Sequence, residues 1–281
     1  MLIEVAKTPP KILLELKPSM KSRVLASLLL CSATLLSTTV PAVAAVTTAT
    51  PTPTNQIPNR QLLPNPFSNI SFESGKPIDT TGQFKTMTPS GAPKIMSDDS
   101  IDGKVVSFDG RSAYQLPVAN AQYDKLKNGM SIEAFFKYDS KGSTTGEHDI
   151  FSNQQSGGLG LGLEGNKLTF YAHVGGGYKQ PNTPLKTDKW LHAVGVIDKQ
   201  AGKVKLYVNG KLVDEKTATG DLKLAQGSNI NHFVLGGDST NGGVESLMTG
   251  LVKSARLYDH VLSADEVKNL NTSAQTAVHH D

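Results

Sequence analysis

Glu147 and Asp149 are the first residues of this sequence whose types and spacing suggest chemistry. They lie two positions apart in GEHDIFS (146–152), with His148 between them. Alternate residues of a β-strand share a face, so a strand here would point both carboxyl groups one way and His148 the other. Two carboxyl groups flanking one bond can hydrolyse a glycoside. Phe151 and Ser152 stand where a third acid would continue the pattern, which favours a polar segment entering a strand over a catalytic site.

A second candidate site is aromatic. In LTFYAHV (168–174), alternation points Tyr171 and His173 away from the apolar face, and Tyr178 and Lys179 follow a run of three glycines. Aromatic rings stack on sugar faces, and hydroxyl and imidazole groups bond to sugar hydroxyls. Single exposed aromatic residues are also common on ordinary surfaces. These four residues are nevertheless the best candidates for a ligand site.

A third candidate is a cation site in GDSTNG (237–242), an oxygen-rich loop flanked by glycine. Asp238 and Asn241 offer one carboxylate and one amide, whereas Ca²⁺ takes six to eight oxygen ligands. The set becomes plausible only if the fold brings Glu73 or Asp109 close. Calcium is therefore a possible cofactor, and no other cofactor is indicated.

The stretch GLGLEG (160–165) formally matches the dinucleotide-binding pattern G-x-G-x-x-G. That site needs a helix directly after the glycines, whereas NKLTFYAH (166–173) predicts another strand. Gly160 and Gly162 instead leave one face of a strand bare, either for a flat ligand or for close packing. No serine elbow, Cys-His pair, HExxH, Walker loop or CxxC motif follows residue 45.

The N-terminal 45 residues predict a signal peptide. From Met20, two basic residues precede an apolar run that ends before Ala42-Val43-Ala44, and cleavage is expected near Ala44-Ala45. The run is too short to span a bilayer. The acidic residues and Pro-Pro before Met20 do not suit a signal peptide, so translation is expected to start at Met20. The protein is then secreted, and Cys31, its one cysteine, is removed with the signal.

Charge limits the partners. The chain has 28 Lys+Arg and 25 Asp+Glu, and residues 1–45 hold five of these bases and two of the acids. The mature chain is therefore neutral, with 23 of each. A neutral chain without basic clusters argues against nucleic acid or an anionic membrane as a partner.

Beyond a Thr/Pro-rich linker at 46–65, short alternating runs broken by Gly, Asn, Asp and Pro predict an all-β sandwich or barrel. The clearest signal is KWLHAVGVIDKQAGKVKLYVNGKLV (189–213), a meander whose second hairpin turns at Asn209-Gly210. Its first strand is apolar on both faces, so both should be covered. Ser263 and Glu266 form a capping box that predicts one short C-terminal helix. The domain is expected over 66–272, with a disordered tail at 273–281.

The ordered set of motifs resembles the laminin G-like, concanavalin A-like jelly-roll family, particularly its bacterial secreted members. The matching pieces are VVSFDGRSAYQLP (105–117), MSIEAFFKY (130–138), the strands from Asp149 to Tyr171, the meander, and FVLGGDS…MTGLVKSARLYDHVLSADEV (233–267). The resemblance implies a two-sheet antiparallel sandwich. In family members the strand that begins at Asp149 carries no chemistry, and members often bind Ca²⁺.

Together these features predict a secreted, non-catalytic recognition module for carbohydrate, such as a glycan or cell-surface polysaccharide. One alternative is a glycoside hydrolase or polysaccharide lyase on the same fold, with Glu147 and Asp149 as the acid–base pair. The other is an adhesive or structural domain that binds a protein. Fold alone does not choose among them.

Overall fold

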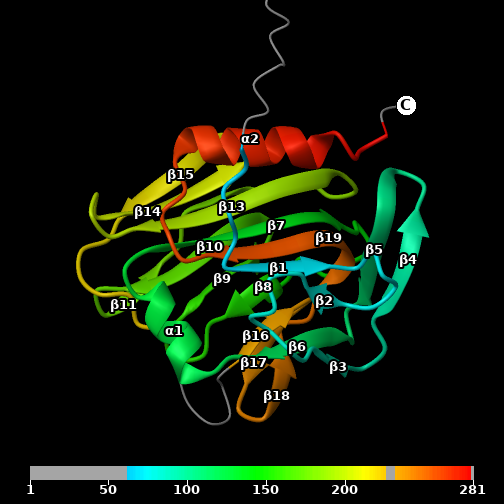
Figure 1. Cartoon of the computed structure of the whole chain (residues 1–281), viewed down its shortest axis with the longest axis horizontal. Coiled ribbons are helices and arrows are strands. Elements are labelled where there is room, and N and C mark those ends of the chain that lie inside the picture. Colours follow the sequence, from blue (N-terminus) through cyan, green and yellow to red (C-terminus); the bar gives the residue numbers. More distant parts are fainter. Residues whose placement is uncertain (1–61, 226–231, 280–281) are drawn as a thin grey trace, which may run out of the picture. The chain divides into compact units, whose positions relative to one another are not determined.

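Two antiparallel sheets make up most of the computed structural model, which describes residues 62–225 and 232–279 (Figure 1). The nine-stranded sheet has the order β15-β14-β13-β7-β19-β1-β2, with β5 paired to β19 and β4 to β5. The eight-stranded sheet has the order β11-β10-β9-β8-β16-β6-β3, with β12 paired to β10. Strands β17 and β18 form a separate hairpin. The predicted all-β jelly-roll sandwich is confirmed.

The strands of the nine-stranded sheet are β1 (Ser68–Ser71), β2 (Ile78–Asp79), β4 (Lys94–Asp98), β5 (Ile101–Asp109), β7 (Met130–Tyr138), β13 (Trp190–Asp198), β14 (Lys203–Val208), β15 (Lys211–Thr217) and β19 (Thr249–Tyr258). Those of the eight-stranded sheet are β3 (Thr88–Ser90), β6 (Ala113–Pro117), β8 (Glu147–Asn153), β9 (Leu159–Glu164), β10 (Lys167–Val174), β11 (Gly177–Lys179), β12 (Asn182–Pro184) and β16 (His232–Leu235). The hairpin is β17 (Asp238–Thr240) with β18 (Gly243–Glu245), and the helices are α1 (Asn120–Leu126) and α2 (Ala264–Gln275).

The core lies between the two sheets, and its largest members are aromatic residues such as Phe108, Phe136, Phe151 and Phe170, all fully buried. Gly195 of β13 allows the sheets to approach, because a Cβ there would lie 2.3 Å from the ring of Phe170. The alternation of β13 is as predicted: Leu191, Ala193 and Ile197 enter this core, while Val194 and Val196 face the other way.

Helix α2 covers the outer face of β13 and β14. Val267 and Leu270 of the helix pack with Val194, Val196 and Tyr207 of the two strands, and Figure 1 shows the helix (red) lying over these strands. The capping box is present: the Ser263 backbone N–H donates to Glu266 Oε2 at 2.8 Å, and Ser263 Oγ accepts from the Glu266 N–H at 3.3 Å. The predicted C-terminal helix is confirmed, whereas α1 was not predicted. Neither described helix is long and apolar enough to cross a membrane.

Under α2, the outer face of β7, β13 and β19 carries a buried ionic cluster. Glu133 Oε1 lies 2.6 Å from the Arg256 guanidinium and 3.0 Å from His192 Nε2, and Tyr258 donates to Glu133 Oε2 at 2.5 Å. Burial by itself would raise the pKa of Glu133, but Arg256, His192 and Tyr258 outweigh it and lower the pKa to about 2. The carboxylate is therefore ionised in the interior.

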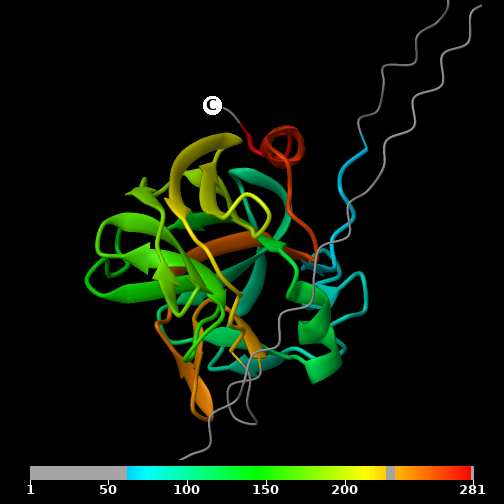
Figure 2. The same ribbon diagram turned by 90° about the vertical axis from the view of Figure 1, so that its left-hand side faces the viewer.

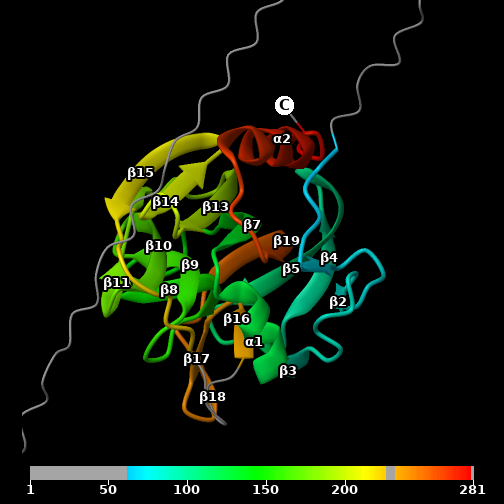
Figure 3. The ribbon, with the colours of Figure 1, turned by 60° about the vertical axis from the view of Figure 1, so that its left-hand side comes forward.

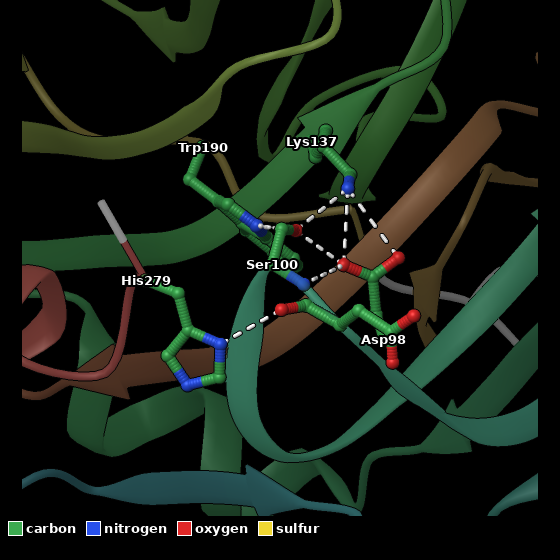
Figure 4. A network of polar contacts seen from close by, with 6 residues as sticks. Asp98, Ser100, Lys137, Trp190 and His279 are labelled. Atoms are coloured by element: carbon green, nitrogen blue, oxygen red, sulfur yellow. Dashed lines mark hydrogen bonds and ion pairs between the residues drawn. The ribbon is translucent and has the colours of Figure 1, made fainter. Parts of the chain in front are cut away.

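The chain end differs from the expected disordered tail. Helix α2 continues to Gln275, and the segment after it pairs with the turn between β4 and β5: the Asp102 N–H donates to Ala277 O, and the His279 N–H donates to Ser100 O. Figure 4 shows Ser100 beside Trp190, Lys137 and Asp98. Ser100 Oγ accepts from Trp190 Nε1 and from Lys137 Nζ, both at 2.9 Å. The two backbone hydrogen bonds to Asp102 and Ser100 hold residues 276–279 in place. The predicted signal peptide and nearly all of the linker lie outside the described residues.

Candidate functional site

Strand β8 positions the carboxyl pair. Glu147, Asp149 and Ser152 lie opposite Glu164, Gly162 and Gly160 of β9, and the register shifts at Ile150. Because of this β-bulge, Asp149 and Ser152 share the outer face although they are three residues apart. The face of β9 that carries Gly160 and Gly162 was predicted to be bare, but neighbouring side chains cover it. A Cβ on Gly162 would lie 2.0 Å from Asp149 Oδ1, and one on Gly160 would lie 2.5 Å from the Cβ of Ser152.

His148 points away from the acids, as predicted. Its Nδ1 lies 2.9 Å from the carbonyl oxygen of Leu247 and its Nε2 lies 3.1 Å from that of Thr145. The imidazole therefore fixes the loop after β18 against the start of β8 and takes no part in the carboxyl pair.

Asp238 joins the pair from a distant part of the chain. Its Oδ1 accepts from Ser152 Oγ at 2.6 Å and from the Gln154 backbone N–H at 3.0 Å, because β17 runs beside the end of β8. Figure 3 shows the β17–β18 hairpin (orange) adjoining β8 at one end of the sheet. The Gln154 side-chain amide then bridges the other two acids, donating to Asp149 Oδ1 at 2.9 Å and to Glu147 Oε1 at 3.2 Å.

The three acids differ in exposure. Asp149 is fully buried and Asp238 is 4% exposed, whereas Glu147 is exposed. Burial is the main cause that raises the pKa of each carboxyl group, and Asp238 adds electrostatic repulsion at both Glu147 and Asp149. The pKa of Asp149 is raised the most and lies well above its ordinary value. Protons are therefore held here at pH values where free carboxyl groups have lost them.

Glu164 of β9 and Glu245 of β18 complete the group. Both are exposed, and both add repulsion that raises the pKa of Glu147. We call Glu147, Asp149, Glu164, Asp238 and Glu245 the acidic face. Within residues 62–225 and 232–279, none of the five makes an ion pair with a basic residue.

The aromatic candidates adjoin the acidic face. Tyr171 lies opposite Gly160, and His173 lies opposite Tyr178 of β11, so all three share the outer face with the acids. The rings of His173 and Tyr178 meet edge to face with centroids 4.9 Å apart. Tyr178 is 38% exposed, whereas Tyr171 is only 3% exposed and does not offer a stacking surface.

The Tyr178 hydroxyl fixes the turn between β8 and β9. It donates to Gly157 O at 2.6 Å, lies within hydrogen-bonding distance of Gln154 O, and accepts from the Gly157 N–H at 3.2 Å. Burial of the hydroxyl raises the pKa of Tyr178 to about 12. Lys179 lies opposite Ala172, a core residue, and so alternates away from the acidic face. Of the four predicted ligand-binding residues, Lys179 does not lie on this face and Tyr171 is buried, so Tyr178 and His173 are the two that a ligand on this face can contact.

The proposed calcium set does not assemble. Glu73 forms an ion pair with Lys253. Asp109 accepts hydrogen bonds from Ser112 Oγ at 2.8 Å and from the Arg111 N–H at 3.0 Å. Asn241 is exposed in the β17–β18 turn, while Asp238 points to β8. In the part of the chain that the structure describes, no three His, Cys, Asp or Glu side chains are arranged to hold a metal ion.

The chemistry available is acceptance of hydrogen bonds and attraction of positive charge. Asp149 Oδ2 is buried without a hydrogen-bond partner, so the carboxyl group with the most strongly raised pKa has no surface to meet a substrate. Glu147 and Glu245 do have such surface, and they flank the buried pair.

Glu147, Asp149, Tyr171, His173 and Tyr178 were predicted from the sequence as separate candidates, and the structure brings them together. Asp238 was not predicted as the third acid, and Gln154, Glu164 and Glu245 were not predicted at all. One signal was available: Gly160 and Gly162 alternate, which indicates that neighbouring side chains occupy the space above them.

Comparison with known proteins identifies the fold family. The model of the concanavalin A-like lectin/glucanases superfamily matches residues 108–268, more than half of the chain. No curated protein matches.

Several solved structures share the fold. The binding domain of botulinum neurotoxin DC in complex with SialylT has a TM-score of 0.60 and 15% identity, over 75% of this chain and 52% of that one. The complex of the same domain with rat synaptotagmin II has a TM-score of 0.57 and 15% identity, over 75% of this chain and 52% of that one. The third is domain 4 of AbnA, a GH43 extracellular arabinanase from Geobacillus stearothermophilus, in complex with arabinotriose. It has a TM-score of 0.55 and 21% identity, over 73% of this chain and 97% of that one.

This chain therefore matches about half of the length of the neurotoxin binding domains and nearly all of the arabinanase domain. At these identities the likeness concerns the fold alone. The match of the family model to its strands and closing helix, together with the two-sheet architecture, places the chain in the concanavalin A-like lectin/glucanase superfamily.

Proposed function

We propose that the protein is a secreted, non-catalytic carbohydrate-binding module that holds its ligand on the acidic face beside Tyr178. The observation that carries this proposal is that β8, β11 and the β17–β18 hairpin bring an exposed ring and acidic groups close together on the outside of the molecule. Tyr178 presents an exposed ring, Glu147 presents an exposed acceptor, and Glu147, Asp149 and Asp238 lie close enough to Tyr178 to raise the pKa of its hydroxyl. A partly exposed ring with acceptors around it suits a sugar, whose apolar face stacks while its hydroxyl groups donate.

Two of the similar structures support this choice of ligand. They are complexes with SialylT and with arabinotriose, while a third is a complex with rat synaptotagmin II. A non-catalytic role is supported by the burial of Asp149, because an acid catalyst must touch the bond that it protonates.

The test is equilibrium binding to a panel of oligosaccharides, with reducing-end release measured in parallel. Tyr178→Ala should weaken the best ligand about tenfold, through loss of the stacking surface. Leu212→Ala is the matched control, since it also removes an exposed large side chain but lies on β15. Equal loss in both variants, or no binding to any glycan, would overturn the proposal.

The hydrolase alternative keeps one observation in its favour, the raised pKa of Glu147, which an acid catalyst needs. Release of reducing ends that Glu147→Gln abolishes would establish it. A protein partner captured by the wild type and lost in Tyr178→Ala, with no glycan bound, would establish the adhesive alternative.

A further inference from the structure

The acidic face differs from the rest of the molecule in how its charges are balanced. Elsewhere on the described surface, carboxylates commonly carry a basic partner. Examples are Lys253 with Glu73, Lys203 with Glu215 and Lys199 with Asp221. The five acids of the acidic face have none, and even Lys167, opposite Glu164 in the β9–β10 pair, makes no ion pair with it. Negative charge is therefore concentrated here and left without a partner.

A second, independent observation lies beneath these acids. The Tyr171 hydroxyl is buried close to Glu147, Asp149 and Glu164, and it makes no hydrogen bond of ordinary geometry, although Thr169 is near. The second carboxylate oxygen of Asp149 is likewise buried and unpartnered. Buried polar atoms without partners are uncommon in folded proteins, and each one implies a missing donor or acceptor. The polar groups under this surface are therefore not all satisfied from within the described chain.

The chemistry that fits is an ammonium group. A divalent metal needs several oxygen ligands at short range in a defined geometry, and no set of three acidic or imidazole side chains in the described residues is arranged in that way. An ammonium group instead carries three donors and a single charge, and it binds to carboxylates spread over a surface. Glu147, Glu164 and Glu245 are exposed and can approach such a group, and Glu164 and Glu245 both lie close enough to Glu147 to raise its pKa.

We infer that the acidic face selects glycans that carry free amino groups, that is, sugars whose amine is not acetylated. This inference rests on the proposed function, which supplies the sugar: the exposed ring of Tyr178 stacks on the pyranose, and the amine points to the carboxylates. Uncharged sugars lack the attraction to the exposed carboxylates of Glu147, Glu164 and Glu245, and anionic sugars are repelled by them.

The experiment uses three oligosaccharides with the same β-1,4-linked backbone that differ only at C2: glucosamine hexamer, N-acetylglucosamine hexamer and cellohexaose. Titration calorimetry on the secreted chain should show the glucosamine hexamer binding at least about tenfold more tightly than either control. Because the interaction is ionic, its affinity should fall several-fold between low salt and about 0.5 M NaCl.

The double variant Glu147→Gln with Glu245→Gln removes two exposed charges but keeps the side-chain size. It should lose most of the preference for the amine and retain the fold, as circular dichroism reports. Glu215→Gln on β15 is the matched control, and it should bind as the wild type does.

The outcomes separate this inference from the proposed function. Equal binding of all three hexamers, or binding of only the neutral ones, overturns the amine preference and leaves the carbohydrate module standing. Binding of no glycan overturns both. Equal binding of penta-lysine and the glucosamine hexamer would show that charge alone is recognised, which overturns selection of a sugar. Stabilisation by micromolar Ca²⁺ that EDTA reverses would assign the face to a metal instead.

Discussion

Asp149 and Gly162 face each other across the β8–β9 pair, and the carboxylate of Asp149 fills the space that a side chain at position 162 would need. A methyl group at Gly162 would lie 2.0 Å from Asp149 Oδ1, which also accepts from Gln154. We expect Gly162→Ala to lower the free energy of unfolding by roughly 1–3 kcal/mol, since a buried group must move to make room.

Urea unfolding measures this change. Gly177→Ala is the control on β11 of the same sheet, where a Cβ would meet no atom within 4 Å. If Gly162→Ala unfolds at the wild-type urea concentration, the Asp149 carboxylate is not held where the structure places it.

The raised pKa of Asp149 makes a prediction about pH. In the folded protein this group keeps its proton at pH values where the unfolded chain, with a pKa near 3.8, has released it. The folded state then binds more protons, so this group makes the protein less stable as pH rises from the unfolded pKa through the folded pKa. Asp149→Asn removes that dependence. We expect the variant to gain stability relative to the wild type as pH rises above about 4, and the difference to vanish in more acidic solution.

The measurement is a series of urea unfolding curves for both proteins between about pH 3.5 and pH 8. Asp221→Asn is the control, because that carboxylate is exposed and its pKa is lowered by Lys199 rather than raised. Parallel stability profiles for Asp149→Asn and the wild type would contradict the assigned burial.

Local sequence patterns were enough to predict an all-β sandwich or barrel, and the resemblance of the ordered motifs favoured the sandwich. The alternation in β10 placed Phe170 on the buried face correctly, and both faces of β13 are covered as predicted, with Leu191 in the core and Val194 under α2. The capping box at Ser263 likewise located α2. Residues 276–279 were mistaken for a free tail because their partners, Ser100 and Asp102, lie far away in the sequence.

The candidate site was predicted only in pieces, for two physical reasons. The bulge at Ile150 changes which residues of β8 share a face, and strict alternation cannot show that Asp149 and Ser152 lie on the same side. Asp238 reaches Ser152 only because β16 pairs with β8 and leads into β17, a contact between residues 86 positions apart. Tyr171 was expected on the surface but is buried. Ser152 of β8 and Gln154 of the turn after it lie over Gly160, which is opposite Tyr171, and alternation within β10 cannot show this.

The ionic cluster under α2 predicts a large effect of a small change. Glu133→Gln would leave Arg256 and His192 facing a neutral amide inside the protein, and loss of one partner of a buried ion pair costs roughly 3–5 kcal/mol. Because the pKa of Glu133 is lowered to about 2, its contribution is present above the unfolded value of 4.5 and is lost as pH falls toward 2. The stability gap between variant and wild type should therefore close in acid.

Chemical denaturation at about pH 7 and pH 3 checks both statements. Glu215→Gln provides the comparison, since that acid pairs with Lys203 at a more exposed position on β15 and should cost less than about 1 kcal/mol. A Glu133→Gln protein as stable as this control would mean that the Glu133 carboxylate does not stabilise the folded state through Arg256 and His192.

Trp190, the one tryptophan of the chain, reports on the C-terminal segment. It is 8% exposed and packs with Phe135 and Ile101 in a small cluster that Ala277 and Val278 help to cover. Figure 2 shows the chain end leaving α2 on the side of the β4–β5 strands. Ending the chain at Thr276 removes this cover and two backbone hydrogen bonds to the β4–β5 turn. We expect the fluorescence maximum of Trp190 to shift to longer wavelength and the free energy of unfolding to fall by roughly 1–3 kcal/mol. A chain that ends at His279 keeps these contacts and should match the wild type. An unshifted maximum in the shorter chain would mean that the segment does not cover the cluster in solution.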